Sequence, residues 1–593
     1  MKTYRPTALL LAALLFTSLF TSGAFAQATA PAPETSAVQV QTNVRVKMRD
    51  GVSLVCDIYR PKADGKFPVL LIRTPYNRKD PGTGMYLASH GYVSIHQDTR
   101  GRFDSEGEFY PFRHEASDGY DTVEWAAALP YSDGRVGMHG GSYVGATQML
   151  AASSAPPHLV GIFPYVTAME YYEGWTYEGG ALMQWFAESW TSGLVVDTVT
   201  RKTSAANRAK QWAEQLPVED YRLLSLPTAQ EVAPYFRDWV EHESNDEYWR
   251  KVKVSDHYAK MNIKALHSGG WHDIFSGGSI RNFIEMQKHA PTAEARKGQR
   301  LLMGPWAHAA TSPEGKIGDV TFGKQAVLDM NAMIVSWYDY VMKGKKNEFA
   351  SDAPVKIFVL GDNVWRDEKE FPLARTNYTK YYLHAGRGAN SANGDGVIST
   401  AMPKAERPDV FEYDPMSPVR TIGGRLCCGG LPPGPADQSP NESRNDVLVY
   451  STPPLTQDTE VTGFITAEVY AATSAADTDF TAMLVDVDEK GYARYLGDGI
   501  IRARYRNSTE RAEPIEPNKI YKYTIDLWAT SNVFKAGHRL RVYLSSSNFP
   551  RFNRNLNTGE KTFGSTRMEK AKQTIYHDTE HPSAIVLPII PRK

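Results

Sequence analysis

The sequence predicts an α/β protein whose mostly parallel sheet is interrupted by a helical insertion and followed by a separate β-sandwich. Three observations support this class. Short apolar runs alternate with helical segments up to residue 167 and again from residue 262; aromatic residues at helical spacing fill the stretch between; and alternating strand-like runs follow residue 347. With 593 residues, the chain is long enough for two or three domains.

The first and third parts of the chain predict strands that alternate with helices. Apolar and polar residues alternate on both sides of the turn Arg49-Asp50-Gly51, which predicts a hairpin. Strands are expected at 40–48, 53–59, 67–72, 91–97, 136–139, 159–166, 263–268 and 300–303. Helices are expected at 119–129 (with Asp118 as its cap), 143–153, 279–289 and 324–342. We therefore expect residues 27–167 and 262–347 to form one α/β domain.

The remaining segments predict two further units. Residues 168–261 carry little strand signal but many aromatic side chains at helical spacing, which predicts a helical cap over the sheet; they include Trp185, Phe186, Trp190, Trp212, Phe236, Trp239 and Trp249. Residues 348–593 contain short alternating runs between Gly, Pro and Asp turns, at 355–360, 380–384, 447–450, 459–472, 481–488, 521–527 and 538–545. Such runs are typical of a β-sandwich or jelly roll.

The first 26 residues predict a secretory signal peptide. Lys2 and Arg5 precede an apolar run from Ala8 to Phe20, and small residues lead to Ala24-Phe25-Ala26. The run is shorter than the ~20 residues that span a bilayer. We therefore expect an exported protein, periplasmic or secreted, with no membrane span after cleavage.

Composition excludes several classes of partner. The formal net charge of −1 provides no basic surface of the kind that holds nucleic acid. No metal-ligand cluster, phosphate-binding loop or dinucleotide fingerprint stands out, so we expect no cofactor and no metal. Three cysteines are too few for a disulfide framework. Cys56 paired with Cys427 or Cys428, or three buried thiols, are both open, and a bridge between the adjacent pair would be strained. The sequence leaves the oligomeric state open.

A serine stands at the turn between a predicted strand and a predicted helix. Ser142 lies in the run Gly140-Gly141-Ser142-Tyr143-Val144-Gly145, directly after the strand at 136–139. In the α/β-hydrolase fold, the nucleophilic serine occupies such a turn, flanked by glycines that let the backbones approach. The usual pattern is G-x-S-x-G, and here Val144 replaces its second glycine. A Gly-Gly-Ser loop without catalytic role is the alternative that this pattern alone leaves open.

An acid and a histidine follow later strands in the order that this fold uses. Asp273 follows the strand at 263–268, and His308 follows the strand at 300–303. A serine hydroxyl needs an imidazole to take its proton and a carboxylate to orient that imidazole. His272 and His139 are rival bases. We favour His308, because neighbouring side chains in a strand-like segment point to opposite faces and His272 would turn away from Asp273.

These motifs resemble the cocaine-esterase, glutaryl-acylase and X-Pro dipeptidyl-peptidase family of serine hydrolases, often labelled CocE/NonD. The family elbow, G-x-S-Y-x-G, matches residues 140–145 and accounts for Val144. The acid segment G-W-x-D matches 270–273, and the histidine segment G-P-W-x-H matches 304–308. Further matches lie at 74–76, 98–101, 105–107, 358–361, 365–366 and 545–552, so the resemblance covers nearly the whole mature chain.

The resemblance implies a function and an oxyanion hole. It implies a serine hydrolase that cleaves small-molecule esters or amides through an acyl-enzyme, with Ser142, Asp273 and His308 as its triad. Together with the predicted signal peptide, this describes an exported enzyme. Tyr76 and the backbone N–H of Tyr143 would bind the oxyanion. Activity should rise with pH, because the histidine must be neutral to act as a base.

The substrate class is narrowed by one departure from the family. Relatives that act on α-amino acid esters place an acid just after the catalytic aspartate, whereas Ile274-Phe275-Ser276 follow here. Glu170, Glu173 and Glu178 are expected on a solvated helix face rather than at a substrate ammonium. We therefore expect an apolar or aromatic acyl or alcohol group. A dipeptidyl-peptidase or amino-ester hydrolase that reads a free amine is the alternative, and a binding protein without catalysis is a further one.

Overall fold

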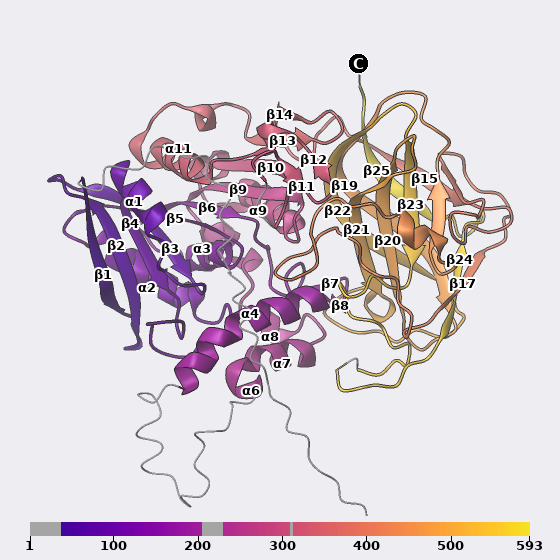
Figure 1. Ribbon diagram of the computed structural model, residues 1–593, viewed down its shortest axis with the longest axis horizontal. Coiled ribbons are helices and arrows are strands. Elements are labelled where there is room, and N and C mark those ends of the chain that lie inside the picture. The colour runs from indigo at the N-terminus through magenta and orange to yellow at the C-terminus, as the bar shows by residue number, and fades with distance from the viewer. Residues whose placement is uncertain (1–36, 204–228, 309–311, 562, 593) are drawn as a thin grey trace, which may run out of the picture.

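The structure is a computed structural model that describes residues 37–203, 229–308, 312–561 and 563–592. The predicted signal peptide, 1–26, lies outside these residues. Two large β-sheets lie side by side, one in the first part of the chain and one in the last, and a group of helices lies below their junction (Figure 1). No helix within the described ranges is long and apolar enough to cross a membrane.

The first sheet has ten strands and is mostly parallel, as the sequence predicts. All neighbours from β4 to β13 pair in parallel, and the outer strands β1, β2 and β14 are antiparallel. Its order is β1 (Val38–Lys47), β2 (Ser53–Pro61), β4 (Val93–Asp98), β3 (Phe67–Thr74), β5 (Ser132–Gly141), β6 (Leu159–Tyr165), β9 (Lys264–His272), β10 (Gln299–Ala307), β13 (Val355–Val359) and β14 (Val364–Glu368).

Helices cover both faces of this sheet, because alternate residues of its central strands are buried on opposite sides. Val69 and Leu71 of β3 pack in one core cluster with α3, whereas Leu70 packs in the other with Tyr338 of α11. The helices of this domain are α1 (Pro81–Ser89), α2 (Glu115–Ala127), α3 (Tyr143–Ser153), α9 (Ser276–His289), α10 (Ala293–Lys297) and α11 (Met330–Lys343). The predicted helix at 143–153 has the bounds of α3.

The segment between β6 and β9 is largely helical, as its aromatic spacing predicts. Its elements are β7 (Tyr177–Glu178), β8 (Ala181–Leu182), α4 (Gln184–Thr203), α6 (Ala229–Val232), α7 (Pro234–Glu241), α8 (Glu247–Arg250) and the 3-10 helix η4 (Ser255–Lys260). It contacts both large sheets: Trp190 of α4 donates to Tyr76 beyond β3, and the N–H of Trp185 donates to the carbonyl of Pro550 at 3.0 Å. Trp212 lies outside the described residues.

The second sheet has eleven strands, almost all paired antiparallel, and forms a β-rich domain. Its strands are β15 (Asn377–His384), β16 (Val397–Ser399), β17 (Asp409–Tyr413), β18 (Leu448–Ser451), β19 (Thr459–Thr473), β20 (Asp479–Val487), β21 (Ala493–Arg502), β22 (Tyr521–Phe534), β23 (Arg539–Ser545), β24 (Ala571–Tyr576) and β25 (Ala584–Ile590). Contacts with the first sheet include two backbone hydrogen bonds of Leu360, just after β13: its N–H donates to Ser531 at 2.9 Å, and its carbonyl accepts from Val533 at 2.8 Å. An ion pair of 2.6 Å also joins Arg366 of β14 to Glu460 of β19.

Two local expectations are wrong. The run 355–360, expected as the first strand of the β-sandwich, forms β13 and extends the first sheet, because it pairs in parallel with β10. Asp118, expected to cap a helix that begins at Gly119, lies inside α2, which begins at Glu115. The carboxylate of Asp118 instead accepts two hydrogen bonds from Arg100, at 2.9 and 2.7 Å, so a buried ion pair accounts for this acid.

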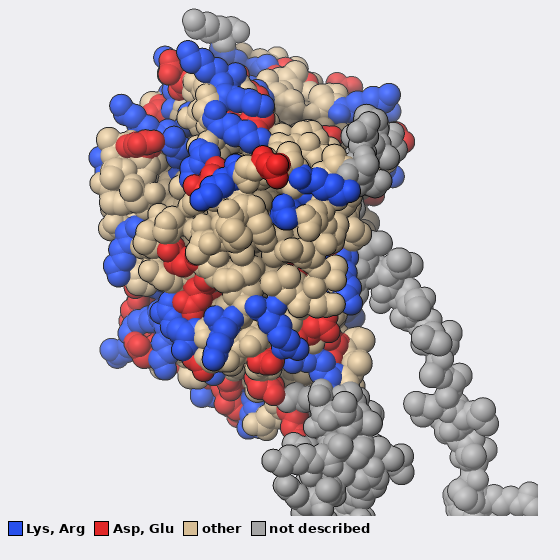
Figure 2. Space-filling view, turned by 90° about the vertical axis from the view of Figure 1, so that its left-hand side faces the viewer, with Lys and Arg blue, Asp and Glu red and all other residues tan. Residues whose placement is uncertain are grey.

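The face of the molecule that carries β1 and β2 has mixed charge. Figure 2 shows basic and acidic side chains interspersed over this face, with uncharged surface between them. In and next to β1, Arg45 pairs with Glu106 at 3.1 Å and Arg49 pairs with Asp121 at 2.6 Å. The small net charge of the chain is therefore reflected on this surface by acidic and basic side chains that lie next to each other.

Candidate active site

The predicted site residues follow four strands of the first sheet at the same edge. Tyr76 follows β3, Ser142 follows β5, Asp273 follows β9 and His308 follows β10. These strands run parallel within the order β3-β5-β6-β9-β10, so their carboxyl ends meet at one edge. Open α/β sheets gather their functional groups at this edge. The fold therefore brings together side chains that lie up to 232 positions apart in the sequence (76 to 308).

Ser142, His308 and Asp273 form a continuous hydrogen-bonded chain. The Nδ1 atom of His308 lies 2.7 Å from Oδ2 of Asp273, and its Nε2 atom lies 3.0 Å from Oγ of Ser142. Asp273 is 0% exposed, and its second oxygen accepts the N–H of Phe275 at 2.7 Å. An ionised carboxylate at Nδ1 keeps the proton on that nitrogen and turns the lone pair of Nε2 toward the hydroxyl. This geometry permits proton transfer from serine to histidine.

Ser142 occupies a sharp turn between β5 and α3. Its φ of 59° and ψ of −127° lie in a region that side-chain-bearing residues rarely adopt. The turn is held by the N–H of Ser142, which donates to the carbonyls of Tyr165 and Val166 at 3.0 and 3.2 Å. The carbonyl of Ser142 accepts the N–H groups of the first turn of α3. The backbone thus presents the hydroxyl at the strand end, as a nucleophile elbow does.

The glycines of the elbow explain why valine is tolerated at position 144. A Cβ atom on Gly140, which has a φ of 136°, would lie 2.2 Å from a methyl group of Val144. A Cβ atom on Gly145 would lie 2.7 Å from the side chain of Thr167. The position that has no room for a side chain, because Thr167 packs against it, is therefore Gly145 rather than 144. The pattern G-x-S-Y-x-G has a steric reason in this fold.

The Tyr143 side chain anchors the start of α3 in the protein interior. Its hydroxyl donates to Glu115 at 2.9 Å, and Glu115 pairs with the buried Arg73 at 2.7 Å. Burial raises the pKa of Tyr143 well above its ordinary value and also raises that of Glu115. The backbone N–H of Tyr143, at the first position of α3, has no partner within the helix. It donates instead to the hydroxyl of Tyr76, beside Ser142.

Tyr76 meets the helical segment at the same place. Although 39% of this residue is exposed, its hydroxyl accepts the indole N–H of Trp190 at 2.8 Å. Burial of the hydroxyl raises its pKa, against hydrogen bonds to Trp190, to Ser142 and to the backbone of Tyr143 that lower it. The Tyr76 hydroxyl and the Tyr143 N–H thus both lie beside Ser142. The contact with Trp190 is one that the sequence analysis did not identify.

The rival histidines lie elsewhere. His139 and His272 are each 1% exposed, and burial lowers the pKa of both to about 3. The ring of His272 packs near Phe322 and Tyr495 rather than at Ser142. This agrees with the expectation that His272 and Asp273, as neighbours in a strand-like segment, point to opposite faces. Among the described residues, the histidine that contacts the serine hydroxyl is His308 rather than either of these two.

The three glutamates considered for substrate binding are engaged within the protein. Glu178 of β7 is 2% exposed and pairs with Arg551 of the β-rich domain at 3.0 Å. Glu170 accepts the hydroxyl of Ser255 at 2.5 Å. Burial, followed by the charge of Glu178, raises the pKa of Glu173 to about 8. The expectation of a solvated helix face is therefore wrong, because this segment docks against the β-rich domain.

Aromatic rings surround the triad. Phe275 lies edge-on to the His308 ring, with ring centroids 5.2 Å apart, and stacks on Trp175 at 4.6 Å. Trp190 stacks on Tyr143 at 5.6 Å and also reaches Tyr76. The aromatic spacing of the sequence indicates such a cluster, but only the fold locates it at the serine. A separate cavity of 680 Å³ lies between η4, α9 and the β-rich domain, and no triad residue lines it.

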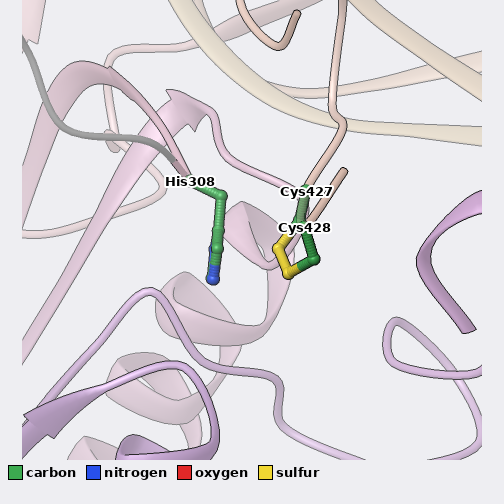
Figure 3. Close-up of side chains that lie close together, drawn as sticks. All are labelled: His308, Cys427 and Cys428. Atoms are coloured by element: carbon green, nitrogen blue, oxygen red, sulfur yellow. A yellow bond between two sulfur atoms is a disulfide. The ribbon is translucent and has the colours of Figure 1, made fainter. Parts of the chain in front are cut away.

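The cysteines pair in the way that the sequence analysis disfavoured. Cys427 and Cys428 are bonded to each other, and Cys56 is a buried free thiol in β2. A bridge from Cys56 does not form, because that residue is 0% exposed inside the first sheet whereas the pair lies on a loop of the β-rich domain. The adjacent pair also lies next to His308 (Figure 3).

Comparisons with known proteins identify the family to which the chain is similar. Residues 50–310 match the family described as X-Pro dipeptidyl-peptidase (S15 family), and residues 347–586 match the X-Pro dipeptidyl-peptidase C-terminal non-catalytic domain. The chain is 38% identical to the cocaine esterase of Rhodococcus sp. (strain MB1 Bresler) over 582 residues, which cover 93% of this chain and 99% of the esterase.

Two solved structures share the fold over almost the whole chain. An aminopeptidase from a marine sediment Thaumarchaeota archaeon has a TM-score of 0.76 at 25% identity and covers 95% of this chain and 98% of its own. An α-amino acid ester hydrolase has a TM-score of 0.76 at 24% identity, with 97% of this chain and 100% of its own covered. The chain therefore belongs to the CocE/NonD family and is a serine hydrolase.

Proposed function

We propose that Ser142 is the nucleophile of this hydrolase, with His308 as its general base and Asp273 as the orienting acid. The observation that carries the proposal is the chain of contacts, 2.7 Å and 3.0 Å long, that joins these three side chains. His308 takes the proton of Ser142 as the oxygen attacks the carbonyl, and returns it to the leaving group. Water then cleaves the acyl-enzyme by the same steps in reverse.

The oxyanion is bound by Tyr76 and the N–H of Tyr143. Because the indole N–H of Trp190 donates to the Tyr76 oxygen, the Tyr76 proton stays available for the substrate. Donors that are fixed before the reaction stabilise the negative charge that develops on the carbonyl oxygen. Trp190 thus acts as a positioning residue that links the helical segment to the chemistry at Ser142.

The preferred substrate is an ester whose acyl or alcohol part is apolar or aromatic. The rings of Phe275, Trp175 and Trp190 are buried next to His308 and Tyr143, so the surroundings of the reacting groups are apolar. No carboxylate follows Asp273, and Glu178 is already paired with Arg551. These features disfavour recognition of a free substrate amine, which is the alternative function of a dipeptidyl-peptidase or amino-ester hydrolase.

Matched substrates test this preference. We expect a benzoate ester to be cleaved with a higher kcat/KM than the acetate of the same alcohol, and an N-acyl amino-acid ester to exceed its free-amine counterpart. Phe275→Leu should lower the benzoate-to-acetate ratio, whereas Tyr378→Leu, at an exposed tyrosine of β15, should leave it unchanged. A strong preference for the free amine would replace this proposal by the alternative.

Further proposals concern export and domain roles. The basic start and apolar run of residues 1–26 support a cleaved signal peptide and a periplasmic or secreted enzyme. The contact from α4 to Tyr76 supports a helical cap at 168–261 over an α/β-hydrolase domain formed by 27–167 and 262–347. The antiparallel strands after residue 376 support a jelly roll within 348–593. The mass of the secreted chain tests export: a mature N-terminus at Gln27 is expected, and an uncleaved cytoplasmic chain would refute it.

A further inference from the structure

Two adjacent cysteines of the β-rich domain lie against the base of the triad. A ring nitrogen of His308 and the sulfur atoms of Cys427 and Cys428 all lie within 4.8 Å of one another. Figure 3 shows the sulfur atoms on the side of the pair that faces the imidazole. The hydrolytic mechanism assigns no role to these sulfurs. Their position next to His308 therefore calls for its own account.

The loop that carries the pair, residues 423–434, is held on three sides. Gly424 and Gly434 exchange two backbone hydrogen bonds of 2.7 and 2.9 Å at its base. Arg425 is 0% exposed and donates to two backbone carbonyls of the β-rich domain at 3.1 and 3.0 Å. A Cβ atom on Gly429 would lie 2.9 Å from the ring of Trp185, so the loop also packs closely on α4. The loop thus fixes where the sulfurs lie.

We infer that Cys427 and Cys428, when reduced, form with Nε2 of His308 a binding site for a thiophilic divalent cation such as Zn²⁺. Two thiolates and one imidazole, with a fourth position left for water, are a ligand set that zinc takes in proteins. Zinc–ligand bonds of about 2.0–2.3 Å in a tetrahedron place the ligand atoms about 3.6–3.8 Å apart. Because the His308 nitrogen already lies within 4.8 Å of both sulfurs, the imidazole needs to move by about 1 Å to reach that spacing. The two sulfurs, which are bonded to each other in the oxidised form, must separate after reduction.

The carboxylate of the triad strengthens this ligand set. Metal-bound histidines commonly donate their second ring N–H to a carboxylate, which fixes the ring and raises its basicity. Asp273 accepts from Nδ1 of His308 at 2.7 Å in this way, which leaves Nε2 as the ligand atom. The contact that this nitrogen now makes is the 3.0 Å hydrogen bond with Ser142. A cation at Nε2 therefore displaces the serine hydroxyl from its base.

The site exists only after the bond between the sulfurs is reduced. A small dithiol breaks the Cys427–Cys428 bond, and two electrons and two protons pass to the cysteines as the dithiol becomes a cyclic disulfide. Cys428 is partly exposed, so such a reagent can reach the pair. Binding of Zn²⁺ then releases the two thiol protons. A disulfide oxidant re-forms the bond, is itself reduced to two thiols and releases the cation.

The consequence for the enzyme rests on the proposed function. While the cation occupies Nε2, His308 cannot accept the proton of Ser142, and hydrolysis stops. With the sulfurs bonded to each other, the thiolate ligands are absent and the base stays free. The pair thus makes the hydrolase sensitive to Zn²⁺ in its reduced form and insensitive in its oxidised form.

Zinc affinity in the two redox forms tests the site without any substrate. The full chain, reduced by a dithiol that is then removed without air, is titrated with Zn²⁺ against a chromogenic chelator, beside the oxidised chain. We expect one Zn²⁺ per reduced chain and an affinity more than about 100-fold tighter than that of the oxidised chain. Loss of an outer-shell partner alone costs about 10- to 100-fold, and here two ligands are lost. Equal affinities would overturn the inference.

Variants separate this pair from the third thiol. The double variant Cys427→Ser/Cys428→Ser should lose the tight binding even after reduction, whereas Cys56→Ala, which removes the buried thiol of β2, should retain it. If the double variant does not fold, Cys428→Ser alone should weaken binding by about 10- to 100-fold. Tight binding by the folded double variant, or its loss in folded Cys56→Ala, would assign the cation to another place.

Hydrolysis measured on the same samples distinguishes the two proposals. Saturating Zn²⁺ should lower the rate of ester hydrolysis by the reduced parent chain by more than about tenfold. The rate of the oxidised chain should be nearly the same with and without Zn²⁺. If Zn²⁺ binds tightly but the rate of the reduced chain is unchanged, His308 is not a ligand of the cation, and the inference is overturned. If no form hydrolyses any ester, the proposed function fails, while the affinities still decide the cation site.

Discussion

The strand ends of the first sheet and the segments that dock against them contribute to the site in different ways. Ser142, Asp273 and His308 each follow a strand directly, so sheet order alone determines that they meet. Trp190 and the Cys427–Cys428 pair reach the same place from α4 and from a loop of the β-rich domain. Their positions depend on how separate units pack together.

The two groups of residues therefore have different roles in the enzyme. The strand ends supply the atoms that make and break bonds, whereas the docking segments supply a donor to Tyr76, aromatic surface and two sulfurs. We therefore expect substitutions at the strand ends to act on kcat by orders of magnitude, and substitutions in the docking segments to act less strongly. The predictions below test this ranking from the largest effect to the smallest.

The largest effect is expected at His308. His308→Ala should lower kcat by about 10⁶-fold, because the base of a serine triad is lost. His272→Ala, at the end of β9, should change kcat by less than about tenfold, because that ring has no contact with Ser142 in the described structure. Steady-state kinetics with a chromogenic ester measure both, and circular dichroism checks folding. Equal losses in two folded variants would erase the distinction between these histidines.

Tyr76 should come second. Tyr76→Phe removes one donor to the oxyanion and keeps the ring, so kcat should fall by about 10²- to 10³-fold with KM little changed. The comparison variant is Tyr86→Phe in α1, a partly buried tyrosine away from Ser142. A folded Tyr76→Phe enzyme with parental kcat would leave the Tyr143 N–H as the sole predicted donor.

Trp190 tests the contribution of the helical segment. Trp190→Phe keeps an aromatic ring but removes the N–H that Tyr76 accepts at 2.8 Å. We expect kcat to fall by about fivefold, on the scale of one lost neutral hydrogen bond of ~1 kcal/mol. In the Tyr76→Phe background the same substitution should have a smaller effect on kcat, because the hydroxyl through which Trp190 acts is already gone. Effects that multiply independently would contradict this coupling.

The smallest effect concerns the interface between the helical segment and the β-rich domain. Glu173 has a folded pKa of about 8 against an ordinary value of 4.5, so the folded state keeps a proton that the unfolded state has lost. The resulting stability is fully present below pH 4.5 and is lost as pH rises through about 8. Glu173→Gln should therefore flatten the decline of the unfolding midpoint between about pH 5 and 9.

A matched carboxylate supplies the control for this measurement. Glu247 is an exposed carboxylate of α8, and Glu247→Gln should leave the pH dependence of the unfolding midpoint as in the parent. Differential scanning fluorimetry at several pH values records both variants. A Glu173→Gln protein whose midpoint declines as steeply as the parent's would show that Glu173 is ionised throughout this range.

The parts that local patterns encode were predictable. Apolar runs located β3, β5, β9 and β10, and glycine spacing located the turn at Ser142, because backbone conformation and burial act within a few residues. The same reasoning ranked His308 above His272. The sheet to which the run 355–360 belongs is not predictable in this way, because a short apolar strand can be buried in either sheet.

Contacts between distant units were not predictable. Glu178 was expected in solvent, yet Arg551 of the β-rich domain neutralises it inside the protein. Nothing near Cys427 and Cys428 in the sequence indicates that they face a histidine more than 100 positions away (427 − 308 = 119). Such pairings depend on how whole domains dock. The spacing of residues within one segment carries no information about that docking.

The most direct test of the account is covalent labelling of the oxidised full chain with a fluorophosphonate, followed by mass spectrometry of its peptides. We predict one adduct per chain, on Ser142, that forms much more slowly in His308→Ala and is absent from folded Ser142→Ala. An adduct on another serine, or continued labelling and ester hydrolysis in folded Ser142→Ala, would contradict the central claim that the strand ends of the first sheet carry the chemistry.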